Sequence, residues 1–193
     1  LQNFLVSQNV GVLCHEFYHS LGAPDLYHYS HDGISPAGSW DLMNSNTNPP
    51  QHMTTYMKMK YGGWVDSIPT LSVDGEYSLN PVTSQTGQAY RIDSNVAGQY
   101  YVLEFRKQSG TFESSIPESG IIIYRIDTTT GMNGNADGPP DELYIYRPGG
   151  TTTSNGSVYD ANFSAEAGRT AINNTTNPSP FFARRLCRKP ESI

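Results

Sequence analysis

Apolar residues recur at a helical spacing near the start of the chain. From Val10 onward they lie three or four residues apart. Two more apolar residues lie before Val10, and the helical spacing is irregular near Val6. The full set is Phe4, Leu5, Val10, Leu13, Phe17 and Leu21. Because such intervals place side chains on one face of an α-helix, we predict a helix over about residues 3–21. It should end at Gly22, since glycine favours the backbone conformation past a helix end and Pro24 prevents the helix from resuming.

The segment that follows has the composition of a loop. Residues 26–50 are rich in Gly, Ser, Asn and Pro, and these residues interrupt regular structure. Residues 51–61, "QHMTTYMKMKY", then predict a second, short helix. The pair Gly62 and Gly63 should stop it.

The hydrophobic pattern changes at about residue 70. Short runs rich in Tyr, Ile and Val alternate with turns that carry Gly and Asn, which predicts about five β-strands. These runs are residues 75–82, 89–94, 99–107, 120–127 and 141–148. The predicted fold class is therefore α+β, with a boundary between Trp64 and Pro69. We divide the chain into a helical part at residues 1–66, a β-rich region at 67–180 and a tail at 181–193.

Composition narrows the classes of function. A net charge of −6 argues against a nucleic-acid surface, and no apolar run approaches the roughly 18 residues that cross a bilayer. Cys14 lies within the first predicted helix, so a buried thiol is favoured over a disulfide with Cys187. Basic residues gather in residues 184–189, in an atypical tail that we do not interpret as a partner site. Because residue 1 is not Met and the chain opens inside a helical pattern, we expect a part of a longer protein.

The strongest candidate chemistry lies in the first helix, in the stretch "CHEFYHSLGAPDLYHY". His15 and His19 are four residues apart, so on a helix they point the same way and can bind one metal ion. Glu16 is rotated by about 100° from His15 and can reach a water on that metal without being a ligand. This is the H-E-x-x-H arrangement of zinc hydrolases. The competing interpretation is a pair of buried core histidines.

A catalytic zinc needs a third protein ligand and an open fourth position. Asp25 lies six residues beyond His19, after the turn expected at Gly22, and is our preferred third ligand. Its competitors are His28, His31 and Asp32, and an Asp-led turn would also explain Asp25. The spacing H-E-x-x-H-x-x-G-x-x-D is similar to the metzincin signature, whose last residue is usually His.

Metzincins also carry a methionine turn below the zinc. The stretch "GSWDLMNSN", residues 38–46, offers Met43 for that turn. A single Met is more often core filler, but its position after the zinc signature favours the turn.

Three stretches together resemble the immune inhibitor A family of secreted bacterial metallopeptidases: "HEFYHSLGAPDLY", "GSWDLMNSN" and "KMKYGGW". The later stretch "YYVLEFRKQSGTFESSIPESGIIIYRID" also resembles that family. The resemblance covers about residues 10–180 and is sharpest over residues 13–64. The family usually has Gly where Tyr18 stands and Asp where His28 stands.

The resemblance implies a secreted zinc endopeptidase acting on proteins or peptides. It implies one zinc ion bound by His15, His19 and Asp25, with Glu16 as general base and Met43 in the methionine turn. Zinc would lower the pKa of its water toward about 7, and Glu16 would take the proton.

The resemblance also implies that residues 1–66 are the C-terminal part of a metzincin-like catalytic domain, followed by the β-rich region. In metzincins a substrate-binding sheet precedes the active-site helix, and residues 1–193 do not include it. We therefore expect Leu13 and Phe17 to be partly exposed, together with Phe4 and Leu5. We also expect residues 1–193 alone to show little peptidase activity.

Several alternatives remain open at this stage. Tyr56 and His52 are candidate donors to the transition state, although helix packing or solvent exposure explains them more simply. Asn133, Asn135 and Asp137 alternate as in a calcium loop, although a hairpin loop explains them better.

Two other functions also fit the sequence. The first is an extracellular binding or adhesion module with a structural zinc, which a fourth ligand from His28 or His31 would indicate. The second is a zinc hydrolase of non-peptide substrates, because the motif defines the metal and base but not the substrate.

Overall fold

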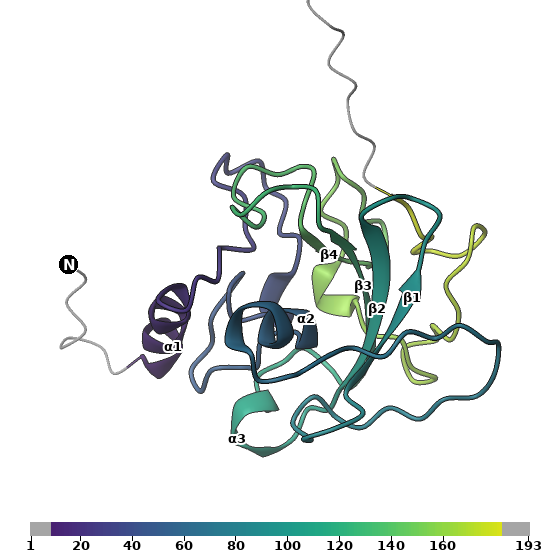
Figure 1. Cartoon of the computed structure of the whole chain (residues 1–193), viewed down its shortest axis with the longest axis horizontal. Helices are drawn as coiled ribbons and strands as arrows, with labels where there is room; N and C mark the ends of the chain where they lie inside the picture. Colours follow the sequence, from purple (N-terminus) through teal and green to yellow (C-terminus); the bar gives the residue numbers. More distant parts are fainter. Residues whose placement is uncertain (1–8, 183–193) are drawn as a thin grey trace, which may run out of the picture.

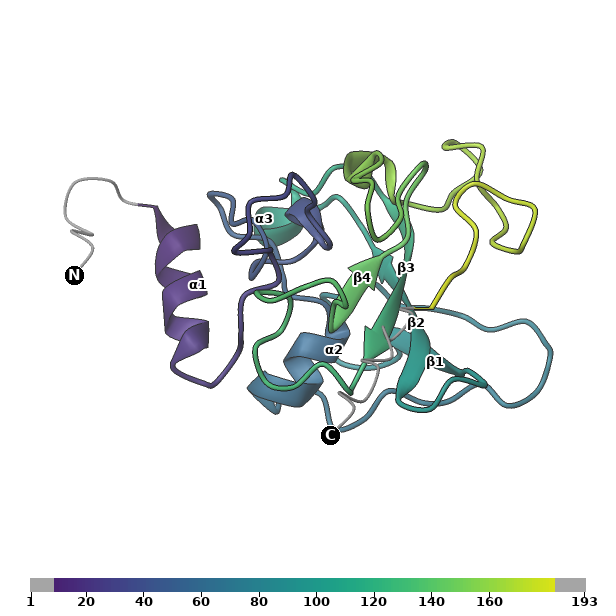
Figure 2. The ribbon, with the colours of Figure 1, turned by 90° about the horizontal axis from the view of Figure 1, so that it is seen from above.

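The computed structural model describes residues 9–182, in which short helices precede an antiparallel sheet. The helices and turns are α1 (Val10–His19), η1 (Gly38–Trp40), α2 (Thr55–Met57), η2 (Lys58–Gly62), α3 (Gly110–Glu113) and η3 (Val158–Asp160). The strands are β1 (Ala89–Asp93), β2 (Gln99–Arg106), β3 (Gly120–Asp127) and β4 (Leu143–Ile145). Two perpendicular views place α1 at one edge and α2 between α1 and the sheet (Figures 1 and 2). The expected α+β class agrees with this mixed arrangement.

Helix α1 carries the histidine motif. Its first turn is capped by the side chain of Asn9, which accepts a hydrogen bond from the backbone N–H of Val12 at 3.3 Å. The helix ends at His19, and Gly22 follows in the left-handed conformation with φ of +91°. The predicted stop at Gly22 therefore lies three residues beyond the observed end, and the predicted start, with Phe4 and Leu5, lies outside the described residues.

The second helix begins at Thr55, four residues later than predicted. Carboxylates hold the free backbone N–H groups at its start: Asp41 accepts from Thr54 at 2.7 Å and Glu104 accepts from Thr55 at 2.7 Å. The helix continues as the wider turn η2 and stops at Gly63, whose φ is +62°. The predicted glycine stop is confirmed.

The sheet has four strands in the order β1-β2-β3-β4, and all neighbours are antiparallel. Four of the five predicted strands are present, but the predicted strand at residues 75–82 is not. That segment joins the sheet only through a bridge between Pro81 and Phe105, and residues 72–78 are exposed. Exposed residues gain no cross-strand packing, and proline cannot donate to a strand ladder, which explains the error.

Both faces of the sheet are covered, which explains why almost every residue of β3 is buried. One face packs under α2 and the loop before it through Tyr100, Val102, Ile122, Tyr124 and Ile126. The other face packs against residues nearer the end of the chain, in a smaller cluster that includes Ile123, Tyr144, Tyr146 and Phe163. The larger cluster takes residues from both sides of the predicted boundary at residues 66 and 67, and the division into domains stays a prediction.

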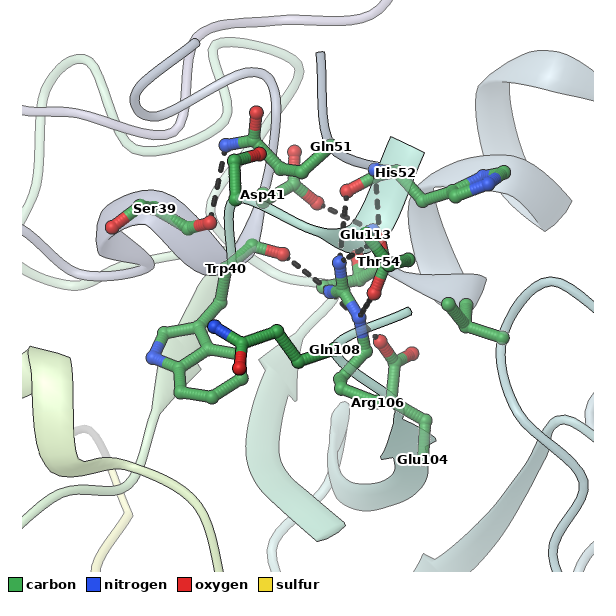
Figure 3. A network of polar contacts seen from close by, with 12 residues as sticks. Ser39, Trp40, Asp41, Gln51, His52, Thr54, Glu104, Arg106, Gln108 and Glu113 are labelled. Carbon is green, nitrogen blue, oxygen red and sulfur yellow. Dashed lines mark hydrogen bonds and ion pairs between the residues drawn. The ribbon is translucent and has the colours of Figure 1, made fainter. Parts of the chain in front are cut away.

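A buried ionic network joins the sheet to the loop that carries Met43 (Figure 3). Arg106, at the end of β2, donates two hydrogen bonds of 2.7 Å to Glu113 and a third to the carbonyl of Trp40. Glu104 lies 3.4 Å from the same guanidinium. The side chains of Arg106, Glu104 and Glu113 are fully buried. The loop before Met43 is therefore held by the sheet.

The outer face of α1 is apolar and open. Leu13 is 53% exposed and Phe17 is 64% exposed, as predicted. They line a cavity of about 510 Å³ together with Trp64 and Phe112. Cys14 is a free thiol, partly buried, whereas Cys187 lies outside the described residues. Within residues 9–182, helices long and apolar enough to cross a membrane are absent.

Candidate metal centre

Three predicted ligands meet at the inner face of α1. The Oδ1 atom of Asp25 lies 3.1 Å from Nε2 of His15 and 3.4 Å from Nε2 of His19. Tetrahedral zinc with ligands at about 2.0–2.1 Å separates its ligand atoms by about 3.3 Å. Within residues 9–182 this is the one such cluster of metal-binding side chains, and its ligand atoms lie within 4.8 Å of one another. The side chains therefore fit a zinc ion.

The tautomers of both histidines favour a cation at this point. Nδ1 of His15 lies 2.9 Å from the carbonyl of Leu42, and Nδ1 of His19 lies 2.7 Å from the carbonyl of Ala23. A carbonyl only accepts, so each Nδ1 carries the proton and each neutral ring presents the lone pair of Nε2. Oδ1 of Asp25 is buried and has no hydrogen-bond partner. Three electron-rich atoms thus converge, and a metal ion would satisfy all of them.

Asp25 and His15 also shift each other's pKa. Burial alone lowers the pKa of His15, but Asp25 and the carbonyl of Leu42 outweigh it, so the pKa is raised. Burial alone raises the pKa of Asp25, but contacts with His15, Tyr29 and His19 outweigh it, so the pKa is lowered. The cluster therefore favours an ionised carboxylate beside the two imidazoles.

Met43 belongs to the turn beside these ligands. It is fully buried, its carbonyl accepts from the N–H of Leu26 at 3.0 Å, and its own N–H donates to Asp41 at 2.8 Å. The residue before it, Leu42, supplies the carbonyl that orients His15. Burial raises the pKa of Asp41 to about 6 despite the backbone N–H groups that it accepts from.

The similarity of this segment to a known family is direct. Residues 6–65 match the immune inhibitor A peptidase M6 catalytic domain. That match covers α1, the ligand cluster, the turn of Met43 and the second helix. It confirms the resemblance over residues 6–65, whereas the later stretch at residues 100–127 lies outside the match. Searches of curated proteins and of solved structures found no match.

Tyr18 has a packing role in this chain. It is 1% exposed, its hydroxyl donates to the carbonyl of Met57 at 2.6 Å, and its ring stacks on Trp64 at 5.4 Å. Tyr18 therefore fastens α1 to the second helix.

Glu16, the predicted general base, is exposed on α1 next to His15. Its charge acts on both His15 and Tyr27 and helps to raise the pKa of each. The carboxylate is thus near the ligand cluster and open to solvent.

The competing ligands lie outside the cluster. Nε2 of His28 lies 2.6 Å from Asp141, and Nδ1 lies 2.9 Å from Asp32, so both ring nitrogens are engaged. His31 is exposed and has a positive φ of 52°. Among the described residues, neither histidine joins the group of three.

Tyr56 and His52 are the two weaker candidates for transition-state donors, and each contacts a different side chain. Tyr56 is 2% exposed, and its hydroxyl donates to Glu142 at 2.7 Å. His52 lines the apolar cavity outside α1 and contacts the ring of Phe112 edge-on. Burial, with Lys58 as a second cause, lowers the pKa of His52 to about 4.

The candidate calcium segment forms the loop between β3 and β4. The side chain of Asn135 donates to the carbonyls of Leu26 and Leu143, at 3.0 and 2.8 Å, and accepts from the N–H of Leu143. Asn133 donates to Asp137 at 2.8 Å. Because the Asn135 amide is used within the protein, the hairpin-loop interpretation explains this segment.

Sequence reasoning missed the contacts that this loop makes with the metal centre. The backbone N–H of Asn135 donates to the carbonyl of Asp25 at 3.0 Å, and that of Tyr29 donates to the carbonyl of Ala136 at 3.0 Å. The hydroxyl of Tyr29 donates to Oδ2 of Asp25 at 2.6 Å. Asn135 and Asp25 are more than 100 residues apart in the sequence, as are Ala136 and Tyr29. No local sequence pattern could therefore indicate these two contacts.

Proposed function

We propose that this chain carries the catalytic centre of a zinc endopeptidase of the M6 type. The observation that carries the proposal is the convergence of Nε2 of His15, Nε2 of His19 and the unpartnered Oδ1 of Asp25. The name of the matching family denotes peptide hydrolysis, and the H-E-x-x-H arrangement of His15, Glu16 and His19 is that of zinc hydrolases. Proteins or peptides are therefore the proposed substrates.

Each residue of the centre has a distinct role. His15, His19 and Asp25 would hold zinc, which would supply a Lewis acid and lower the pKa of a bound water. Glu16 takes a proton from the attacking water and passes it to the leaving amine. The carbonyls of Leu42 and Ala23 hold the two imidazoles in the tautomer that binds metal. Met43 fills the space beside the ligands as the methionine turn.

The surroundings of the cluster favour an open fourth position over a closed structural site. A fourth ligand from His28 would have to break its contacts with Asp141 and Asp32. This supports the hydrolase over an adhesion module with structural zinc. Secretion from a bacterium is the location that we propose, because the M6 resemblance implies it.

Glu16→Gln tests the mechanism. The variant should keep about one zinc per chain, because Glu16 is not a ligand. It should lose at least ~10²-fold in casein hydrolysis, the low end for general acid–base catalysis. Glu118→Gln, at another exposed glutamate, is the matched control and should match wild type. Zinc content is measured in residues 1–193, and hydrolysis in the full-length protein.

Each outcome separates the alternatives. Loss of zinc in Glu16→Gln would make Glu16 a ligand and overturn the mechanism. Zinc without casein hydrolysis in the wild-type protein would support a structural site or a non-peptide substrate instead.

A further inference from the structure

We propose that Tyr29 is a positioning residue that fixes the rotation of the Asp25 carboxylate, so that only Oδ1 faces the metal. The inference rests on the proposed metal centre. The sequence motif does not include Tyr29, which lies four residues after Asp25.

The geometry of the carboxylate shows what Tyr29 does. Its hydroxyl donates to Oδ2 of Asp25 at 2.6 Å, while Oδ1 lies between the two imidazoles at 3.1 and 3.4 Å. A carboxylate can bind a metal through one oxygen or both, and rotation of its terminal torsion costs little. A strong hydrogen bond to Oδ2 resists that rotation and favours one-oxygen binding, which leaves the fourth position open for water.

Tyr29 is itself held in place, although its side chain is 57% exposed. Its backbone N–H donates to the carbonyl of Ala136 in the β3–β4 loop at 3.0 Å, and its ring packs on Tyr27 at 5.6 Å. Together with Asp25 and His19 it lines a cavity of about 330 Å³. An ordinary phenol is protonated at neutral pH, so Tyr29 can donate this hydrogen bond.

Tyr27 is the competing residue for this role. It also lies near Asp25 and interacts with that carboxylate through charge and a side-chain hydrogen bond. The 2.6 Å contact to the carboxylate, however, belongs to Tyr29. The two tyrosines must therefore be compared directly.

The test measures metal binding by residues 1–193 with zinc and with Co²⁺ as a spectroscopic probe. Tyr29→Phe should weaken zinc binding about 10–100-fold, the usual cost of losing an outer-shell partner. It should also shift the Co²⁺ absorption bands at saturating metal, because the ligand geometry changes. Tyr27→Phe should change both measurements less. Tyr159→Phe, another exposed tyrosine, is the matched control and should leave both unchanged.

The outcomes are distinct. Wild-type zinc affinity and unchanged Co²⁺ bands in Tyr29→Phe would overturn the inference, as would a larger effect of Tyr27→Phe. If Tyr29→Phe also lowers the melting temperature of the metal-free chain, zinc affinity no longer isolates the role of Tyr29. The Co²⁺ absorption bands at saturating metal then test the inference. A wild-type chain that binds neither metal would overturn the proposed function instead.

Discussion

Asp25 shows how strongly one side chain depends on its surroundings. It is 5% exposed, carries an oxygen without a hydrogen-bond partner, and lies within 3.4 Å of two imidazoles. An unpaired buried carboxylate oxygen is costly, so a bound cation would relieve the site. His28, three residues later, is equally buried but has a carboxylate at each nitrogen.

Asp25→Ala should therefore weaken zinc binding by more than the ~10–100-fold typical of an outer-shell partner, because it removes a direct ligand. His28→Ala should change zinc affinity much less. Competition with a chelator measures both in residues 1–193, below the melting temperature of each variant. Our ligand set is wrong if His28→Ala empties the site while Asp25→Ala leaves it full.

His28 should instead affect the pH dependence of stability. Burial alone lowers its pKa, but Asp141 and Asp32 outweigh burial, so the folded-state pKa is raised above the unfolded value of about 6.5. A raised pKa contributes stability that is fully present below pH ~6.5 and is lost as the pH rises through the folded-state pKa.

His28→Asn should remove this contribution. The difference in unfolding free energy between wild type and variant should therefore shrink as the pH rises above ~6.5. Urea unfolding at several pH values measures it, with His31→Asn, at an exposed position, as control. A difference that stays constant or grows with pH would contradict the assignment.

At the scale of elements, the β3–β4 loop supports the segment that carries Asp25. Gly134 of this loop has a φ of +58°, and a Cβ there would lie 2.5 Å from the carbonyl oxygen of Asp25 and 2.6 Å from Pro24. Gly131, in the same loop, has a φ of +92° with no atom within 4 Å of its Cβ position. The loop can approach the ligand segment only because residue 134 has no side chain.

Gly134→Ala should therefore lower both thermal stability and zinc affinity. Gly131→Ala should carry only the left-handed backbone strain, about 1–2 kcal/mol, and keep its zinc affinity. Thermal melting and chelator competition measure the two effects. Equal zinc affinity in the two variants would show that the loop does not position Asp25.

At the scale of the whole molecule, the Arg106 network makes the helical part and the sheet depend on each other (Figure 3). Arg106 donates to Glu113 and to the carbonyl of Trp40, and Glu113 accepts from the backbone of His52 at 3.0 Å. The core beneath them continues from Tyr18 of α1 to Ala161. Loss of this network should therefore disturb the turn of Met43 as well as the sheet.

Glu113→Gln should destabilise the protein by about 3–5 kcal/mol, because it removes one partner of a fully buried ion pair. Asp93→Asn, in the exposed pair of Arg91 and Asp93, is the matched control and should cost at most about 1 kcal/mol. Denaturant unfolding measures both. Similar losses in the two variants would show that the network contributes little.

The sequence alone determined the features that depend on near neighbours along the chain. The spacing of His15 and His19 follows from helical geometry, the stops near Gly22 and Gly63 follow from backbone freedom, and four strands follow from runs of Tyr, Ile and Val. The match over residues 6–65 likewise rests on a contiguous motif. Residues 75–82 failed as a strand because their composition suits a strand, but residues 75–78 are exposed and gain no cross-strand packing.

Only the tertiary structure decided which groups complete the metal centre. The carbonyl of Leu42 orients His15 from 27 residues away, Asn135 binds the carbonyls of Asp25 and Leu26, and Asp141 engages His28 from 113 residues away. A buried polar group has no water to bond, so it is paired with another polar group of the protein. The fold decides which groups lie close enough to pair, and the spacing of residues along the chain does not show this.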